Sequence, residues 1–166
     1  MEATRFEVGP SQCIPQQGDF GGKAEVTLNV FFDSSALAKR YIEEKGSDQV
    51  QAILSSAAAL AVSVICVPEI VSALCRLRRE RKLSTEEYRN AKASVLTDID
   101  DATVIGITEE VIAHGVVLLE QFPLRSADAL HIACASEWAT DLFVSADDRQ
   151  CKAAKRRGLR VEGISA

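Results

Sequence analysis

Four acidic side chains occur where the sequence predicts the start of a helix, namely Asp33, Glu69, Asp128 and Asp147. A single Asp or Glu in a first helical turn needs no function, because the helix dipole stabilises it there by about 0.3 to 1 kcal/mol. Several carboxylates in one cleft are different, because they repel and raise one another's pKa unless a cation neutralises them. No His or Cys ligand set accompanies these acids, so an all-oxygen site would favour a hard ion, Mg²⁺ or Mn²⁺.

Such a site predicts chemistry on phosphate esters. A bound ion lowers the pKa of a water molecule to make a nucleophile, and it neutralises the charge that grows on phosphate during an in-line displacement. The sequence contains no P-loop and no glycine-rich phosphate cradle, which argues against a nucleoside triphosphate as substrate. Hydrolysis of a phosphodiester, with one metal ion or two, is therefore the leading reaction.

Strands and helices alternate along the chain. The segments that read as strands are apolar and rich in β-branched or aromatic residues, and they cover 27–32, 60–65, 102–107, 141–145 and 159–164. Helical segments lie between them, beginning with one expected over 35–44. This order predicts an α/β fold, a three-layer α/β/α sandwich around a mostly parallel sheet of four or five strands.

The expected fold would bring the four acids together. In a parallel sheet, a helix that follows a strand begins at the carboxyl edge, where ligand sites of open α/β sheets lie. Asp33, Glu69 and Asp147 should therefore share that edge. Asp128 begins a helix that leads back to a strand, so its first turn should point to the same rim.

Sequence signals also predict how some helices begin. Ser47 and Thr108 are expected N-caps, and Ser84 with Glu87 is expected to form a capping box. The longest nearly apolar run, 57–67, is shorter than the roughly 18 residues that span a bilayer, so no membrane association is expected.

Composition fits one ordinary domain of 166 residues, of which 47% are hydrophobic. The net charge of −5 does not indicate nucleic-acid binding as a basic domain would. Positive charge is concentrated in 76–82 and 152–160, which solvated helix faces would also explain. The odd number of cysteines and the apolar surroundings of Cys66, Cys75 and Cys134 predict buried thiols in a reducing cytoplasm.

Four motifs stand in an order and spacing that is specific. They read FFDSSALAKRY, VPEIVSAL, LRSADALHIA and FVSADDRQCKAAKRRGLRV, between about residues 28 and 163. Together they resemble the PIN-domain ribonucleases and, within them, the VapC toxins of toxin-antitoxin pairs. Residues 27–166 are therefore expected to form a PIN domain. Residues 1–26 are expected to be an N-terminal extension without an assigned role, either disordered or derived from an upstream start.

The resemblance implies roles for the site residues. The four acids would be the catalytic quartet, with Asp33, Asp128 and Asp147 as direct ligands of Mg²⁺ or Mn²⁺ and Glu69 acting through water. Ser145 matches the family's hydroxyl position before the last acid. An N-cap of the last long helix is an equally compatible role for Ser145, and Asp148, at N3 relative to it, would then serve that helix.

The resemblance also implies an activity and partners. It implies a homodimeric endoribonuclease that is selective for single-stranded RNA and is silenced by a cognate antitoxin whose C-terminal segment enters the active-site groove. The sequence adds basic residues close to the acids that could contact phosphates, namely Arg40, Arg125, Arg149 and Lys152. Pairing of Arg125 or Arg149 with a neighbouring carboxylate is the alternative.

The only histidines are His114 and His131. His131 follows Asp128 by three residues and could share its helix face. We expect both to be packed or surface residues, because the acids already provide the metal ligands.

Two other functions remain open at this point. One is a PIN-fold RNA-processing or binding module that is not a toxin, and the presence of all four acids argues against a module without catalysis. The other is a different Mg²⁺ phosphohydrolase on a doubly wound fold, but the DxD motif of such phosphatases is absent, since Asp33 is followed by two serines.

Overall fold

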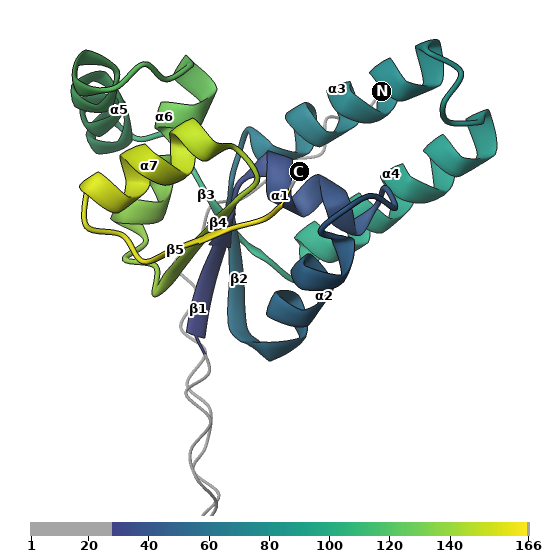
Figure 1. Ribbon diagram of the computed structural model, residues 1–166, viewed down its shortest axis with the longest axis horizontal. Coiled ribbons are helices and arrows are strands. Elements are labelled where there is room, and N and C mark those ends of the chain that lie inside the picture. The colour runs from purple at the N-terminus through teal and green to yellow at the C-terminus, as the bar shows by residue number, and fades with distance from the viewer. Residues whose placement is uncertain (1–27, 166) are drawn as a thin grey trace, which may run out of the picture.

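The computed structural model describes residues 28–165, so the predicted N-terminal extension, 1–26, lies outside the described residues. Five parallel strands form one sheet in the order β3-β2-β1-β4-β5 (Figure 1). They are β1 (Leu28–Phe32), β2 (Ala57–Ser63), β3 (Thr103–Ile105), β4 (Leu142–Ser145) and β5 (Val161–Gly163). The predicted α/β class and strand number are confirmed.

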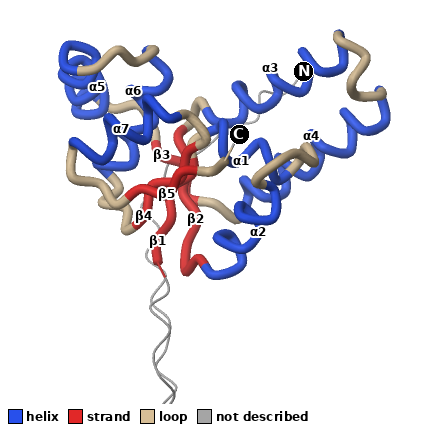
Figure 2. Tube along the Cα trace, in the orientation of Figure 1, coloured by secondary structure: helices blue, strands red, loops and turns tan. Residues whose placement is uncertain are grey.

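Helices cover both faces of this sheet. Figure 2 shows α5, α6 and α7 on one side of the strands, with α1, α2, α3 and α4 on the other. The helices are α1 (Ser34–Leu37), the 3₁₀ helix η1 (Ala38–Arg40), α2 (Ser47–Ser56), α3 (Cys66–Arg79), α4 (Thr85–Asp100), α5 (Glu109–Gln121), α6 (Ser126–Glu137) and α7 (Asp148–Arg156). The predicted three-layer sandwich is therefore the observed architecture.

The central strand β1 is buried on both faces. Its side chains alternate, so Val30 and Phe32 pack with the α1 to α4 layer while Phe31 packs with the α5 to α7 layer. The ring of Phe31 stacks on that of Phe143 in β4, with centroids 5.9 Å apart. Burial on both sides explains why the second half of β1, Val30 to Phe32, is apolar up to Asp33, whereas Asn29 near the start of the strand is exposed.

Some predicted helix boundaries are confirmed and others are wrong. The capping box holds, since Ser84 Oγ accepts from the Glu87 N–H at 3.1 Å and Glu87 Oε2 accepts from the Ser84 N–H at 2.7 Å. Thr108 caps α5 as expected. The helix expected over 35–44 is only α1 followed by η1. Gly46 rather than Ser47 caps α2, because Ser47 Oγ is occupied by the Glu44 N–H at 3.1 Å.

The described cysteines are free thiols in the protein interior or partly buried, as predicted. Burial raises the pKa of Cys66, and it raises the pKa of Cys134 to about 11. Both thiols are therefore poor nucleophiles. Within residues 28–165, no helix has the length and apolar character needed to cross a membrane.

The order of the strands defines a switch point at β1. The chain passes from β1 to β2 on one side, whereas β4 pairs with β1 on the other side. The Asp33 N–H donates to the Val144 carbonyl at 3.0 Å, which holds the carboxyl ends of β1 and β4 side by side. Ligand sites of open α/β sheets lie at such a position.

Candidate active site

Asp33 occupies the centre of the carboxyl edge. It follows β1 directly and caps α1, where its Oδ1 accepts from the Ala36 N–H at 2.8 Å. The Ser35 hydroxyl lies 2.7 Å from Oδ2. Only 3% of Asp33 is exposed, and this burial raises its pKa in spite of the opposing charge of His131 and the hydrogen bonds it accepts. A cation beside Asp33 would offset the cost of keeping this carboxylate charged.

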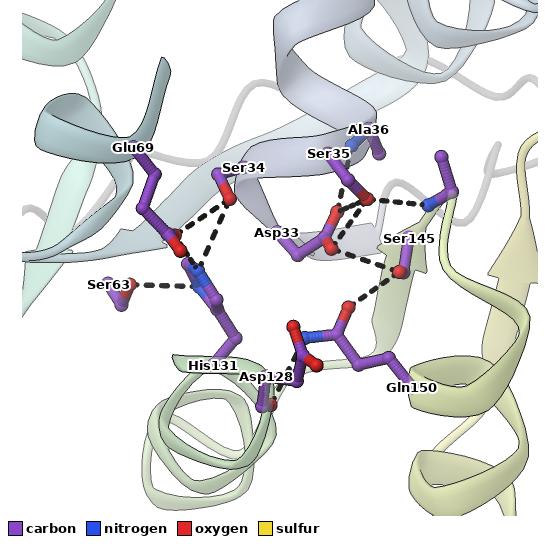
Figure 3. A network of polar contacts seen from close by, with 11 residues as sticks. Asp33, Ser34, Ser35, Ala36, Ser63, Glu69, Asp128, His131, Ser145 and Gln150 are labelled. Atoms are coloured by element: carbon purple, nitrogen blue, oxygen red, sulfur yellow. Dashed lines mark hydrogen bonds and ion pairs between the residues drawn. The ribbon is translucent and has the colours of Figure 1, made fainter. Parts of the chain in front are cut away.

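Ser145 and Gln150 connect Asp33 to helices α6 and α7 (Figure 3). Ser145 Oγ lies 3.0 Å from Asp33 Oδ2 and 2.6 Å from Gln150 Oε1. A hydroxyl has one proton, so Ser145 donates a hydrogen bond to one of these two oxygens at any moment. Gln150 Nε2 donates to the backbone carbonyl of Asp128 at 3.1 Å. Gln150 is fully buried, so it fixes the first turn of α7 against the first turn of α6.

Asp147, and not Ser145, caps α7. Asp147 Oδ1 accepts from the Arg149 N–H at 2.7 Å and from the Gln150 N–H at 3.2 Å. Partial burial acts to raise the pKa of Asp147, but these hydrogen bonds hold it below its ordinary value. The predicted N-cap role of Ser145 is wrong because Ser145 ends β4 and its hydroxyl bonds Asp33. Asp148 is therefore the first residue of α7 and not the N3 residue.

Glu69 reaches the same edge from the first turn of α3. Its Oε2 accepts from the Ser34 hydroxyl at 2.8 Å and from His131 Nε2 at 2.6 Å. Partial burial acts to raise the pKa of Glu69, but the bonds from His131 and Ser34 outweigh it and lower the pKa. The other ring nitrogen of His131, Nδ1, lies 2.9 Å from Ser63 Oγ. Glu69 is thus bound through its neighbours to α1, α6 and β2.

Asp128 lies in the first turn of α6, as predicted, and is half-buried. Its Oδ2 accepts from the Arg125 N–H at 3.1 Å. Figure 3 shows Asp128 beside Gln150, both below Asp33, with Glu69 and His131 to their left. The four acids thus stand at the starts of four separate helices, α1, α3, α6 and α7. Ser145 and Gln150 link Asp33 to the backbone of Asp128, and Ser34, which follows Asp33 in the chain, bonds Glu69.

The basic residues predicted to contact phosphate lie in the two different helical layers that cover the sheet. Arg125 and Lys152 are exposed, and each stands close in sequence to one of the acids. Arg149 lies on α7 with its Nη2 3.4 Å from Asp147 Oδ2, which confirms the alternative of a local ion pair for this residue. Arg40 is engaged elsewhere, because Nη2 donates to Asp98 Oδ1 at 3.2 Å and Nη1 donates to Gln51 at 2.7 Å. Arg40 is therefore a structural residue of the α1 to α4 layer.

A groove of about 510 Å³ adjoins the acidic edge on the side of β5. Its lining includes Asp147 together with Lys45 and Arg149, so both signs of charge face the same space. A chain of phosphodiesters would find cations beside the acids here.

The donors present suit a hard cation, since carboxylate oxygens are what Mg²⁺ and Mn²⁺ prefer. Within residues 28–165, however, no three His, Cys, Asp or Glu side chains are gathered closely enough to hold a metal ion as they stand. The carboxylates of Asp128 and Asp147 instead accept hydrogen bonds from their own helix starts. Ligation by these two residues would require both side chains to turn toward Asp33.

Two residues of this network were not predicted as part of the site. His131 was expected to be packed or at the surface, and it is packed, but it also bonds Glu69 directly. Gln150 carried one available signal, because it is a polar residue on the helix face that also presents the buried Ala153 and Ala154. A buried polar residue on an apolar face needs partners, and for Gln150 these are Ser145 and Asp128.

Comparison with known proteins gives concordant results. Residues 30–156, which include all four acids, match the family model of the PIN domain. Ribonuclease VapC46 of Mycobacterium tuberculosis is 31% identical over 136 residues, covering 80% of this chain and 95% of that protein.

Solved structures share the fold. VapC20 of Mycobacterium tuberculosis, described as a sarcin-ricin loop cleaving toxin, superposes with a TM-score of 0.58 at 16% identity and covers 75% of this chain and 94% of that one. VapBC-5 of the same organism, from the VapBC family of toxin-antitoxin systems, superposes with a TM-score of 0.55 at 16% identity, with coverages of 83% and 98%.

Proposed function

The chain belongs to the PIN domain family, and from this membership we propose that it is an endoribonuclease that hydrolyses phosphodiester bonds of single-stranded RNA. The observation that carries the proposal is the buried carboxylate of Asp33, joined through Ser145 and Ser34 to the elements that hold the other three acids. The name of the relative VapC46, a ribonuclease, supports the choice of RNA.

The acids would hold Mg²⁺ or Mn²⁺, through the carboxylates of Asp33, Asp128 and Asp147 and through a water on Glu69. When bound, the ion would supply charge for the phosphate and a lowered pKa for a water molecule. Asp33 gains most from such a neighbour, because it is the acid whose pKa burial raises.

The surrounding residues have separate roles in this proposal. Exposed cations beside the acids, Arg125 and Lys152, would contact phosphates of the RNA on either side of the scissile bond. Ser145 keeps Asp33 in place by its hydrogen bond. Glu69 Oε1 has no hydrogen-bond partner within residues 28–165, so this oxygen is available to orient a water molecule.

We assign the protein the role of toxin in a toxin-antitoxin pair, as a cytoplasmic homodimer restrained by a cognate antitoxin. The structural likeness to VapBC-5 and the 31% sequence identity with VapC46 support this role. Free buried thiols suit a reducing compartment. The presence of all four acids argues against a non-catalytic binding module, since such a module needs at most the N-cap that Asp33 provides for α1.

A cleavage assay tests the proposed activity. The full chain is incubated with a pool of single-stranded RNA of randomised sequence, in Mg²⁺, in Mn²⁺ or in EDTA, and with a DNA pool of matched sequence. Cleavage of RNA that requires the metal is the expected result. RNA that stays intact in both metals would contradict the proposed ribonuclease activity. Undiminished cleavage in EDTA would contradict the proposed requirement for a metal ion.

A growth assay tests the role as a toxin. Induced expression in a growing bacterium should arrest growth, and coexpression of a small protein encoded immediately upstream should restore it. Growth that continues in the absence of any such protein would favour an RNA-processing module instead.

A further inference from the structure

A buried histidine reaches the acidic edge from inside the sandwich. His131 belongs to α6 and is 1% exposed. Its Nε2 lies 2.6 Å from Glu69 Oε2 and its Nδ1 lies 2.9 Å from Ser63 Oγ, at the end of β2 (Figure 3). Both nitrogens of the imidazole are therefore occupied, and the ring is held between a strand end and a helix start.

The order Ser63, His131, Glu69 looks like a nucleophilic triad, but burial excludes that use. A nucleophilic serine must reach the substrate, and Ser63 is only 1% exposed. Of these three hydrogen-bonded residues only Glu69 reaches solvent, and its side chain is 35% exposed. Ser63 therefore fixes the buried side of the His131 ring, and the other side of the ring holds the solvent-exposed carboxylate of Glu69.

The hydrogen bonds define where the imidazole proton lies. A carboxylate oxygen only accepts, so His131 Nε2 donates to Glu69 Oε2. The Ser63 hydroxyl pairs with the other nitrogen, which keeps the ring in this orientation. The Ser34 hydroxyl donates to the same Oε2 at 2.8 Å, so two donors hold one oxygen of Glu69. Within the described residues, Oε1 accepts from none.

We propose that His131 is a positioning residue of the active site: it holds Glu69 so that Oε1 stays turned outward, available to a water molecule or a cation. His131 itself touches neither substrate nor metal. This inference rests on the proposed function and extends it to a residue outside the acidic quartet. Loss of a hydrogen-bond donor behind a ligand typically costs about 10 to 100-fold in metal affinity or activity.

Nuclear magnetic resonance tests the geometry without RNA or metal. The ¹⁵N shifts and couplings of the two histidines are measured in the full chain with EDTA, and the variant His114→Gln assigns them. His131 should carry a proton on Nε2 that exchanges slowly with water. A ring with an unprotonated Nε2, or with the averaged shifts of a solvent-exposed imidazole, would overturn the proposal.

Substitution tests the consequence. His131→Leu removes the donor, while His131→Gln places an amide N–H near the position of Nε2. With the oligonucleotide that the wild type cleaves fastest, His131→Leu should lower kcat by about 10 to 100-fold and change KM by less than about threefold. His131→Gln should recover part of the loss. Calorimetric titration with Mn²⁺ alone should show weaker binding to His131→Leu.

The matched control is His114→Gln, because His114 is exposed and pairs with Glu137 at 3.0 Å. It should keep both kcat and Mn²⁺ affinity. A folded His131→Leu with wild-type kcat and Mn²⁺ affinity would overturn the proposal. If His131→Leu does not fold, Ser63→Ala replaces it, and it should show a several-fold loss of kcat for the same reason, while a wild-type kcat would count against the proposal.

Failure of the proposed function would look different. In that case the wild type would leave RNA intact and Asp33→Asn would change nothing in the assay. Failure of the positioning role alone would leave the wild type active and Asp33→Asn inactive, with His131→Leu as active as the wild type.

Discussion

Ser145 Oγ lies 3.0 Å from Asp33 Oδ2, although 112 residues separate these side chains along the chain. The contact exists because β1 and β4 are parallel neighbours and end at the same edge of the sheet. A backbone bond from the Asp33 N–H to the Val144 carbonyl, 3.0 Å long, fixes the same register. Ser145, two residues before the last predicted acid, Asp147, therefore holds the first one, Asp33, in place.

The first prediction concerns Asp33→Asn. Cleavage of RNA should fall below detection, because the charge at the centre of the site is lost while the shape is kept. The surrounding serine hydroxyls can accept from the new amide as well as donate, so the variant should fold. The measurement is the RNA cleavage assay, with circular dichroism to confirm the fold. Full activity would contradict the placing of Asp33 at the reaction centre.

Asp33→Asn should also change how stability depends on pH. The pKa of Asp33 is raised above 3.8 in the folded protein, so the folded chain keeps a proton here that the unfolded chain releases. The stabilisation this gives is present at low pH and is lost as pH rises through the raised pKa. Asn cannot ionise, so in EDTA the Tm of the variant should equal or exceed that of the wild type near neutral pH. A lower Tm across the whole pH range would contradict this reasoning.

The second prediction separates two adjacent acids. Asp147→Asn should abolish cleavage but keep the fold, because Asn caps a helix about as well as Asp. Asp148→Asn is the matched control: Asp148 is exposed at the first position of α7, and its loss should reduce cleavage only slightly. Cleavage rates and Tm values of both variants are compared. An equal loss of activity in the two would mean that the wrong member of the pair has been assigned.

The third prediction concerns the buried link between α6 and α7. Gln150→Leu removes the donor to the Asp128 carbonyl and should lower the free energy of unfolding by about 1 to 3 kcal/mol. Cleavage should fall as well, because Asp128 and Asp147 lose their common support. Gln121→Leu, at an exposed position of α5, should change the free energy of unfolding by about 0.5 kcal/mol or less. Urea unfolding measures both, and equal stabilities would argue against the link.

The fourth prediction concerns stability away from the acids. Gly46 has a φ of +94°, and an added Cβ would lie 2.6 Å from Ile164 Cγ2 and 2.8 Å from the Ser165 carbonyl oxygen. Gly158 has a similar φ of +88° but open space around it. Gly158→Ala should therefore cost only the backbone strain of about 1 to 2 kcal/mol. Gly46→Ala should cost about 1 to 3 kcal/mol more, because the C-terminal segment must move.

Urea unfolding again provides the comparison. Both variants lose free energy of unfolding through backbone strain, so the difference between them measures the cost of the contact between the Cβ at position 46 and the segment at Ile164. Equal losses would show that this segment moves aside without cost. RNA cleavage measured below the Tm should stay near the wild-type rate for Gly158→Ala, since Gly158 has open space around it and does not line the groove beside Asp147.

Local patterns were sufficient for the fold class and for the acids. The apolar run of β1 ends at Asp33 in both the prediction and the structure, because a strand buried on two faces admits no charged residue before its end. Parallel strands separated by helices require crossovers, so the alternation of elements fixed which helix starts meet at one edge. For this reason Asp33, Glu69, Asp128 and Asp147 were candidates for one site from the sequence alone, and their joint role at a metal stays a prediction.

Local patterns were insufficient where a side chain had a choice of partner. Ser145 is an acceptable N-cap by type, yet its hydroxyl bonds Asp33 and leaves the cap of α7 to Asp147. The helix expected over 35–44 shrinks to α1 and η1, and Gly46 then turns the chain with a positive φ.

The sequence by itself determined the α/β alternation, the positions of the acids and the family, because these depend on residue types and spacings along the chain. The tertiary structure alone decided the partners: His131 behind Glu69, Gln150 between Ser145 and Asp128, and Arg40 with Asp98 instead of phosphate. Hydrogen bonds of this kind join residues far apart in the chain, and the side chains that make them carry no local pattern that names the partner.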